Sequence, residues 1–245
     1  MYKDIMKSIE HRNSPLPKGP WLLTQRWEHL LFMHYPVLKE RLQELVPKEL
    51  EIDTFKGQAW ITVIPFKVSD MRLRYLPPFP YLNTYLELNV RTYVKRKGRT
   101  GIYFFSLDAD KMAAVLGARA GTLPYYYAKM KMQQDNGRFY FESIRKDVSG
   151  AALKGSYRRD SAPYFPKKDG LDFWLLERYY LWSYKKGQLF CLGIHHKRWE
   201  VSEVKAEISS HQLVPFLPGE ELPKQPLMHY AESKRVLFWR LRKSP

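Results

Sequence analysis

Residues 86–107 constrain the fold more than any other part of the chain, because they join two strand-forming runs through a short turn. Residues 86–97 and 102–107 are rich in β-branched and aromatic side chains, and a basic turn from Gly98 to Gly101 separates them. Two such runs around a short glycine turn are typical of an antiparallel β-hairpin. We therefore expect a protein built mainly from antiparallel strands.

Similar runs recur along the chain, several of them around turns such as Asn136-Gly137. Strands are predicted over residues 24–34, 51–53, 58–66, 125–132, 138–145, 149–158, 179–184 and 189–195. The first of these could also form a helix, and residues 75–83 are too rich in proline for a central strand. Helices are predicted over residues 37–46, 171–177 and from Asp108 or Asp110 to Gly121, where the apolar stripe is Met112, Val115 and Leu116. The expected fold class is α+β, predominantly antiparallel β with a few short helices.

The chain is expected to form one cytoplasmic domain. Pro15, Pro17 and Pro20 mark residues 1–20 as a loose N-terminal arm, and residues 21–245 form the β-rich domain. The N-terminus lacks the apolar stretch of a signal peptide, and no window is apolar enough for a membrane helix. The single cysteine, Cys191, fits a reducing compartment. A homo-oligomer is compatible with the sequence, and a membrane partner is not expected.

The net charge of +16 would attract polyanions such as nucleic acid. However, the basic clusters lie mostly at predicted turns or ends, and no nucleic-acid-binding motif accompanies them. Nucleic acid is therefore not the expected partner, and polyanion binding is kept as an alternative function.

A polar face is predicted on the strand formed by residues 85–93. Alternate side chains of a strand share a face, so Glu87, Asn89 and Arg91 point one way while Leu88 points the other way. The alternation alone favours an ordinary solvated sheet face. What favours a pocket wall instead is the mix of an acid, an amide and a guanidinium between tyrosines, since a carboxylate beside a guanidinium can bind a small polar ligand.

The remaining chemistry-bearing residues give weaker signals. Tyr125 follows Pro124 and could line either a pocket rim or a sheet surface. His195 and His196 are adjacent on a predicted strand, so one is expected to be buried and the other exposed. The histidines form no i, i+4 pair, and no Cys-x-x-Cys or cofactor-binding glycine motif is present. The sequence thus predicts neither a metal site nor a cofactor.

Short segments spread over residues 27–209 carry a family resemblance. They are residues 27–36, 46–57, 60–66, 87–93, 104–110, 123–126, 177–179 and His195-His196. In these segments the chain resembles the YqjF-like family of bacterial proteins, a domain of unknown function. That family is distantly similar in fold to acetoacetate decarboxylase, which implies a curved sheet or barrel around a central cavity. The resemblance also implies that Glu87 corresponds to an active-site glutamate of that enzyme.

The resemblance does not extend to the reaction of acetoacetate decarboxylase. That enzyme forms a Schiff base through a lysine pair that follows a proline, and here the same place is occupied by Pro124-Tyr125-Tyr126. Because a tyrosine cannot form an imine with a ketone, decarboxylation through a Schiff base is not expected.

The sequence and the resemblance together predict a pocket that binds a small polar organic molecule. Glu87 and Arg91 are the candidate catalytic residues. The candidate ligand-binding residues are Asn89, Arg119, Tyr125, Tyr126 and His34. Two functions stay open, an enzyme without Schiff-base chemistry and a ligand-binding or sensing module without turnover.

Overall fold

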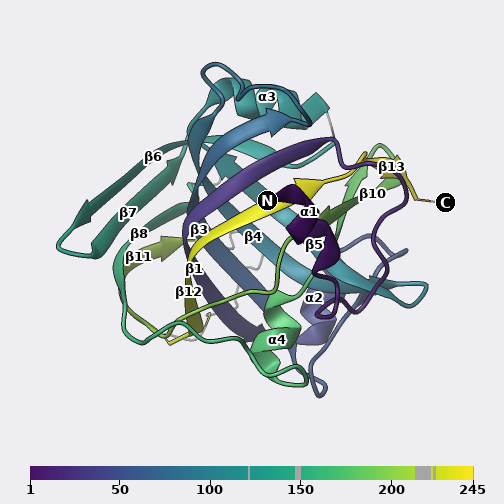
Figure 1. The fold of residues 1–245 in the computed structure, drawn as a ribbon. Coiled ribbons are helices and arrows are strands. Elements are labelled where there is room, and N and C mark those ends of the chain that lie inside the picture. Colours follow the sequence, from purple (N-terminus) through teal and green to yellow (C-terminus); the bar gives the residue numbers. More distant parts are fainter. Residues whose placement is uncertain (121, 147–149, 213–221, 223–224, 245) are drawn as a thin grey trace.

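The computed structural model describes residues 1–120, 122–146, 150–212, 222 and 225–244, and in this part the chain forms a 13-stranded sheet and four short helices (Figure 1). Seven strands form a closed ring: β1 (Leu23–Val37), β3 (Ala59–Leu73), β4 (Thr84–Arg96), β5 (Arg99–Ala109), β9 (Tyr180–Lys185), β10 (Gln188–His195) and β12 (Leu227–Phe238). Their hydrogen-bonded order is β5-β9-β10-β12-β1-β3-β4, and β4 pairs again with β5. The sheet therefore curves back on itself.

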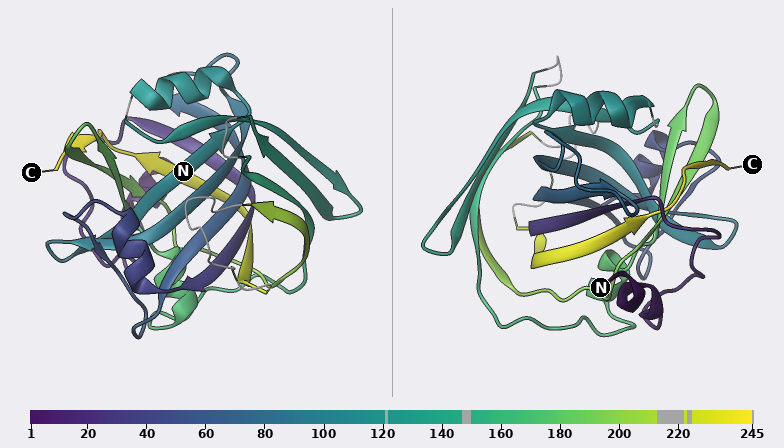
Figure 2. Two further views of the ribbon diagram at one scale, coloured as in Figure 1. Left: turned by 180° about the vertical axis from the view of Figure 1, so that it is seen from behind. Right: turned by 45° about the horizontal axis from the view of Figure 1, so that its top comes forward.

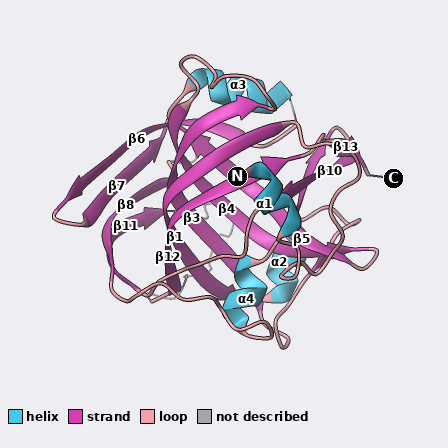
Figure 3. Ribbon diagram, in the orientation of Figure 1, coloured by secondary structure: helices cyan, strands magenta, loops and turns pink. Residues whose placement is uncertain are grey.

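The other strands extend this ring. β6 (Tyr125–Asp135) pairs with β5 in parallel and leads to β7 (Arg138–Arg145), β8 (Ala152–Arg159) and β11 (Val204–Gln212). The hairpin of β6 and β7 projects away from the ring (Figure 3). Two short strands, β2 (Glu51–Ile52) and β13 (Arg242–Lys243), pair with β4 and β10. All pairings except those of β5 with β6 and with β9 are antiparallel, which confirms the predicted α+β, mainly antiparallel class.

Three of the four described helices lie at the ends of the ring, and the N-terminal helix lies on its side. The helices are α1 (Tyr2–Lys7), α2 (Lys39–Leu45), α3 (Met112–Ala120) and α4 (Leu171–Leu176), and α3 lies at the end opposite α2 and α4 (Figure 2). The prediction of an apolar stripe on α3 is partly wrong, because Met112 and Leu116 are exposed and only Val115 is buried. Ala113, Ala114 and Gly117 of α3 line the interior cavity instead. None of the helices in the described ranges is long and apolar enough to cross a membrane.

The tight turns use a common backbone conformation. In Lys97-Gly98, Asn136-Gly137 and Lys186-Gly187 both residues have positive φ angles, as two-residue hairpin turns of type I′ require. The predicted turn between Gly98 and Gly101 is therefore shorter than expected, and Gly101 belongs to β5. A Cβ atom on Gly101 would lie 2.3 Å from the carbonyl oxygen of Tyr180, so this glycine permits the close approach of β9.

Irregularities in β1 and β3 change which residues face the inside of the ring. In β1, odd-numbered residues such as Gln25 face inward before His29, and even-numbered residues such as Leu30 face inward after it. His29 has a φ of 56°, and Asp70, with a φ of 49°, marks the same change in β3. The pairing register between the two strands shifts in these regions, as β-bulges do. Residues from both halves of each strand thus line the interior, and Gln25 is the polar one among them.

The N-terminal 20 residues, predicted as a loose arm, are packed onto the ring. Ile5 and His11 are buried, and the backbone carbonyl of Ile5 is 2.8 Å from Nε2 of His195. Pro17 lies against Gly193 so closely that a Cβ atom there would be 2.3 Å from the proline ring. The arm therefore covers one side of β10.

Candidate functional site

The ring of strands encloses a cavity of about 620 Å³, a size typical of sites for small organic molecules. Most of its wall is apolar, with lining residues that include Leu30, Phe32, Ile64, Phe66, Phe104, Leu107, Ile194 and Phe238. Ala113, Ala114 and Gly117 of α3 line one end. The polar lining residues are Gln25, Tyr85, Glu87, Asn89, Arg91, Tyr125 and Arg240.

One face of β4 supplies the central polar groups of the cavity. Glu87, Asn89 and Arg91 are 4%, 6% and 9% exposed, and all three line the cavity. In the register with β3, Glu87 is paired with Phe66 and Asn89 with Ile64, and these two apolar neighbours also line the cavity. The polar face therefore points inward, and the alternative of a solvated face is wrong.

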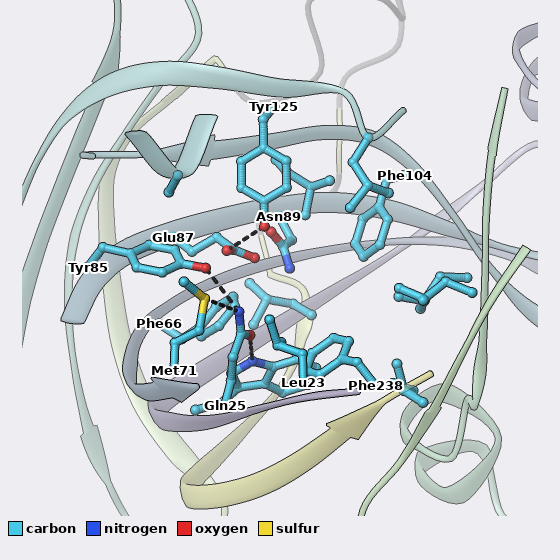
Figure 4. Close-up of a pocket in the computed structure, with 18 of the residues that line it drawn as sticks. Leu23, Gln25, Phe66, Met71, Tyr85, Glu87, Asn89, Phe104, Tyr125 and Phe238 are labelled. Atoms are coloured by element: carbon cyan, nitrogen blue, oxygen red, sulfur yellow. Dashed lines mark hydrogen bonds between the residues drawn. The ribbon is translucent and has the colours of Figure 1, made fainter. Parts of the chain in front are cut away.

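Glu87 is held by a buried phenol from a different strand. The hydroxyl of Tyr125, the first residue of β6, donates a 2.8 Å hydrogen bond to Oε2 of Glu87 (Figure 4). Burial raises the pKa of Glu87 to about 7, although hydrogen bonds from Tyr125, Asn89 and Tyr85 oppose part of the rise. Burial also raises the pKa of Tyr125 well above its usual value, so the phenol stays a donor. A carboxyl group of this kind can accept or release a proton near neutral pH.

A second polar group of the cavity is contributed by Gln25 of β1. Its amide nitrogen donates to the Tyr85 hydroxyl at 3.2 Å, and its amide oxygen accepts a 2.9 Å hydrogen bond from the indole of Trp27 (Figure 4). The sequence reasoning missed Gln25. The sequence does show a single amide within the mainly apolar residues 24–34. Its orientation could not be predicted, because the inward-facing positions of this strand change from odd to even numbers at His29.

Arg91 is a buried cation without a carboxylate partner among the residues that the structure describes. Its Nε atom is buried and has no hydrogen-bond partner among the described residues. The amide oxygen of the Asn89 side chain is also buried and also lacks such a partner. Burial lowers the pKa of Arg91, yet a guanidinium stays charged in proteins. Within the described residues, the cavity therefore contains a buried guanidinium that pairs with no carboxylate and an amide oxygen that accepts no hydrogen bond.

The other predicted site residues lie elsewhere or cannot be placed. His34 is fully buried and is not among the lining residues of the cavity, and its Nδ1 is 2.8 Å from the hydroxyl of Thr62. Tyr126 points away from the cavity, and the guanidinium of Arg145 lies 4.2 Å from its ring centre. Arg119 belongs to α3, but its side chain is outside the described part of the structure. Of the predicted set, the structure thus brings together Glu87, Asn89, Arg91 and Tyr125 in the cavity wall.

Among the described residues that line the cavity, none is a lysine. Lys129 and Lys131, the next lysines after Pro124, are exposed on β6. The lining residues described here therefore offer no amine for a Schiff base.

Solved structures with the same fold are enzymes related to acetoacetate decarboxylase. Acetoacetate decarboxylase from Legionella pneumophila is 14% identical, with a TM-score of 0.63 over 98% of this chain and 94% of that chain. An acetoacetate decarboxylase-like enzyme from Sphingomonas wittichii has a TM-score of 0.64 at 12% identity, over 94% and 96% of the two chains. The enduracididine biosynthesis enzyme MppR, complexed with the condensation product of pyruvate and imidazole 4-carboxaldehyde, has a TM-score of 0.63 at 12% identity, over 94% and 92%. At these identities the similarity shows the fold alone.

Closer relatives identify the family. Uncharacterized protein YqjF from Bacillus subtilis (strain 168) is 46% identical over 241 residues, which are 98% of this chain and 99% of that protein. Residues 24–235 match the DUF2071 family, described as uncharacterized conserved proteins. The chain therefore belongs to the DUF2071 family, with the fold of acetoacetate decarboxylase.

Proposed function

We propose that the protein binds a small organic acid, with the carboxylate of the acid on Arg91 and a second polar group of the acid against Glu87. The observation that carries this proposal is the buried guanidinium of Arg91, which has no carboxylate partner in the described part of the chain. Burying an unpaired charge is costly, and a bound carboxylate would offset this cost through charge-assisted hydrogen bonds. The ligand would therefore be anionic.

The rest of the ligand is expected to be apolar. Apart from the polar set described above, the cavity wall consists of aliphatic and aromatic side chains such as Phe32 and Phe104. Burying an apolar group against these side chains favours binding by about 25 cal/mol for each Å² removed from water. The complex of MppR with a product derived from pyruvate, which is itself a carboxylate, supports this ligand class for the shared fold.

Two roles are compatible with such a ligand. A carboxyl group with a pKa near 7 is suited to general acid–base catalysis, so Glu87 could move a proton at a carbon beside a ligand carbonyl. A module that only binds the acid would use the same contacts without turnover. The enzyme role is favoured by the hydrogen bond from Tyr125, which orients the carboxyl group toward the cavity.

Phenylpyruvate is a suitable probe because it combines a carboxylate, a neighbouring carbonyl and an aromatic ring. We expect it to raise the melting temperature of the wild-type protein, and we expect Arg91→Met to weaken binding by about tenfold or more. Arg158→Met removes an exposed arginine of β8 and serves as the matched control. Equal binding of phenylpyruvate and 3-phenylpropionamide, which lacks the carboxylate, would contradict the proposal.

Hydrogen exchange at the probe distinguishes the two roles. If Glu87 moves a proton, the wild-type protein accelerates deuterium uptake at C3 of phenylpyruvate in heavy water, as measured by NMR, and Glu87→Gln does not. Saturable binding without any acceleration of exchange would assign the protein to the binding role.

A further inference from the structure

A second cluster of polar side chains lies outside the cavity, where the N-terminal arm meets the ring. It consists of His11 from the arm, Glu177 from the residue after α4, and His196 from the residue after β10. They are 6%, 2% and 0% exposed, and one potential ligand atom of each lies within 4.8 Å of those of the other two. We propose that these three residues form a binding site for a divalent transition metal of the zinc class.

The hydrogen bonds of the two histidines leave one basic nitrogen on each ring. Nε2 of His11 is 2.9 Å from the carbonyl oxygen of His196, and Nδ1 of His196 is 2.8 Å from the carbonyl oxygen of Lys197. Because a carbonyl oxygen only accepts hydrogen bonds, both of these nitrogens carry the ring proton. Metal-binding histidines commonly donate their second ring N–H to a carbonyl or carboxylate in this way.

The nitrogen left over on His196 has nothing to bind in the described structure. Its Nε2 atom is buried and lacks a hydrogen-bond partner there. An unsatisfied buried acceptor destabilises the folded protein, and a coordinated metal ion would satisfy it. This orphaned lone pair is an observation independent of the clustering itself.

Glu177 is held in place for coordination by two other donors. The backbone N–H of Trp199 donates to Oε1 at 2.8 Å, and the hydroxyl of Tyr179 donates to Oε2. Each carboxylate oxygen can accept a further interaction, so a metal ion can bind without displacing either donor. These contacts supply the outer hydrogen bonds that orient a metal ligand.

The composition of the site selects the kind of metal. Two imidazoles and one carboxylate suit zinc and neighbouring transition metals, whereas calcium and magnesium prefer oxygen ligands. The cations Lys234 and Arg198 act electrostatically on Glu177, which further disfavours ions held mainly by charge. Imidazole coordination would therefore provide most of the affinity.

Three protein ligands leave one position of a tetrahedral zinc site for water or a small ligand. His11 also lines a pocket of about 440 Å³, together with Ser8, Phe173 and Lys197. Among the three proposed ligands, His11 is thus the one that borders an open pocket. By linking His11 to the two ligands on the ring, it would also fasten the arm to the rest of the protein.

The test is a zinc titration of the full chain after removal of metals with a chelator. We expect one equivalent of Zn²⁺ to bind by native mass spectrometry and to raise the melting temperature, and we expect Co²⁺ to give the visible absorption of a tetrahedral site. His11→Gln, Glu177→Gln and His196→Gln should each weaken Zn²⁺ binding by at least about tenfold. His29→Gln changes a histidine on β1 outside the cluster and should bind Zn²⁺ like the wild-type protein.

Failure of the wild-type protein to bind one equivalent of Zn²⁺, or equal Zn²⁺ affinity in His11→Gln and His29→Gln, would overturn the proposal. His11→Gln is the decisive variant should His196→Gln fail to fold, because His11 belongs to the arm and not to a strand of the ring. Metal binding is measured directly, so the result does not depend on whether phenylpyruvate binds in the cavity.

Discussion

The phenol of Tyr125 donates a 2.8 Å hydrogen bond to the buried carboxyl group of Glu87. The first residue of β6 therefore orients the carboxyl group that β4 places in the cavity. Residues 38 positions apart in the sequence thereby form one unit. The unit is buried, which raises the pKa of the carboxyl group and favours its protonated form.

The protonation of Glu87 should make stability depend on pH. Burial raises the pKa of Glu87 from 4.5 to about 7, so the folded protein holds the proton more tightly than the unfolded chain. This contribution is fully present below the unfolded pKa and is lost as the pH rises through about 7. Relative to Glu87→Gln, the wild-type free energy of unfolding should therefore fall by about 3 kcal/mol across this range. Urea denaturation at several pH values measures it, with the exposed Glu44→Gln as the control. Parallel pH profiles for the wild type and Glu87→Gln would contradict the prediction.

Removing the charge of Arg91 should separate stability from binding. Because Arg91 is buried without a carboxylate partner in the described residues, Arg91→Met relieves a desolvation cost in the ligand-free protein. We expect the variant to unfold at an equal or higher urea concentration than the wild type while losing stabilisation by phenylpyruvate. A loss of stability without ligand would show that the guanidinium is needed for packing.

A buried and an exposed ion pair should contribute very differently to the stability of the fold. Arg178 and Asp53 are both buried, with Nη1 and Oδ2 2.7 Å apart, whereas Lys95 and Glu51 form an exposed pair at 2.9 Å. Arg178→Met leaves a buried carboxylate alone and should cost about 3–5 kcal/mol. Lys95→Met should leave the midpoint of unfolding almost unchanged. Similar effects of the two substitutions in chemical denaturation would rule out this ranking.

Two glycines should respond in opposite directions to alanine. Gly101→Ala would bring a Cβ atom within 2.3 Å of both the Tyr180 carbonyl oxygen and the Trp182 ring, so it should destabilise the protein by about 1–3 kcal/mol. Gly117 lies in α3 with nothing within 4 Å of an added Cβ atom, and Gly117→Ala should stabilise the helix by about 1 kcal/mol. Thermal unfolding of the two variants checks both signs.

The hairpins were predictable from the sequence because their turns depend on local backbone chemistry. Asn136-Gly137 and Lys186-Gly187 tolerate positive φ angles, and the structure has turns at both. Gly101 misled the prediction, because a glycine required for contact with a distant strand resembles a turn glycine in the sequence. Local patterns cannot distinguish these two uses of glycine.

The candidate site was only partly predictable, because its formation depends on contacts between residues that are far apart in the sequence. Alternation placed Glu87, Asn89 and Arg91 on one face, but only closure of the ring decides that this face is inside. The expectation that one of His195 and His196 is exposed was wrong, since both are fully buried beneath the N-terminal arm or beside it. Contacts made by the arm span more than 180 residues and leave no periodic signal.

Neighbouring strands of the ring differ widely in the number of residues that they pair. β1 and β12 pair over eleven positions, but β5 meets β9 only at Ile102–Leu181 and Tyr103–Trp182, and β10 meets β12 at only two positions. Opening either short junction would break few backbone hydrogen bonds, and four residues beside these junctions, Ile102, Leu181, Ile194 and Phe238, line the cavity. Amide hydrogens there should exchange with solvent sooner than those of the long ladders. The junctions with the fewest backbone hydrogen bonds thus border the cavity directly.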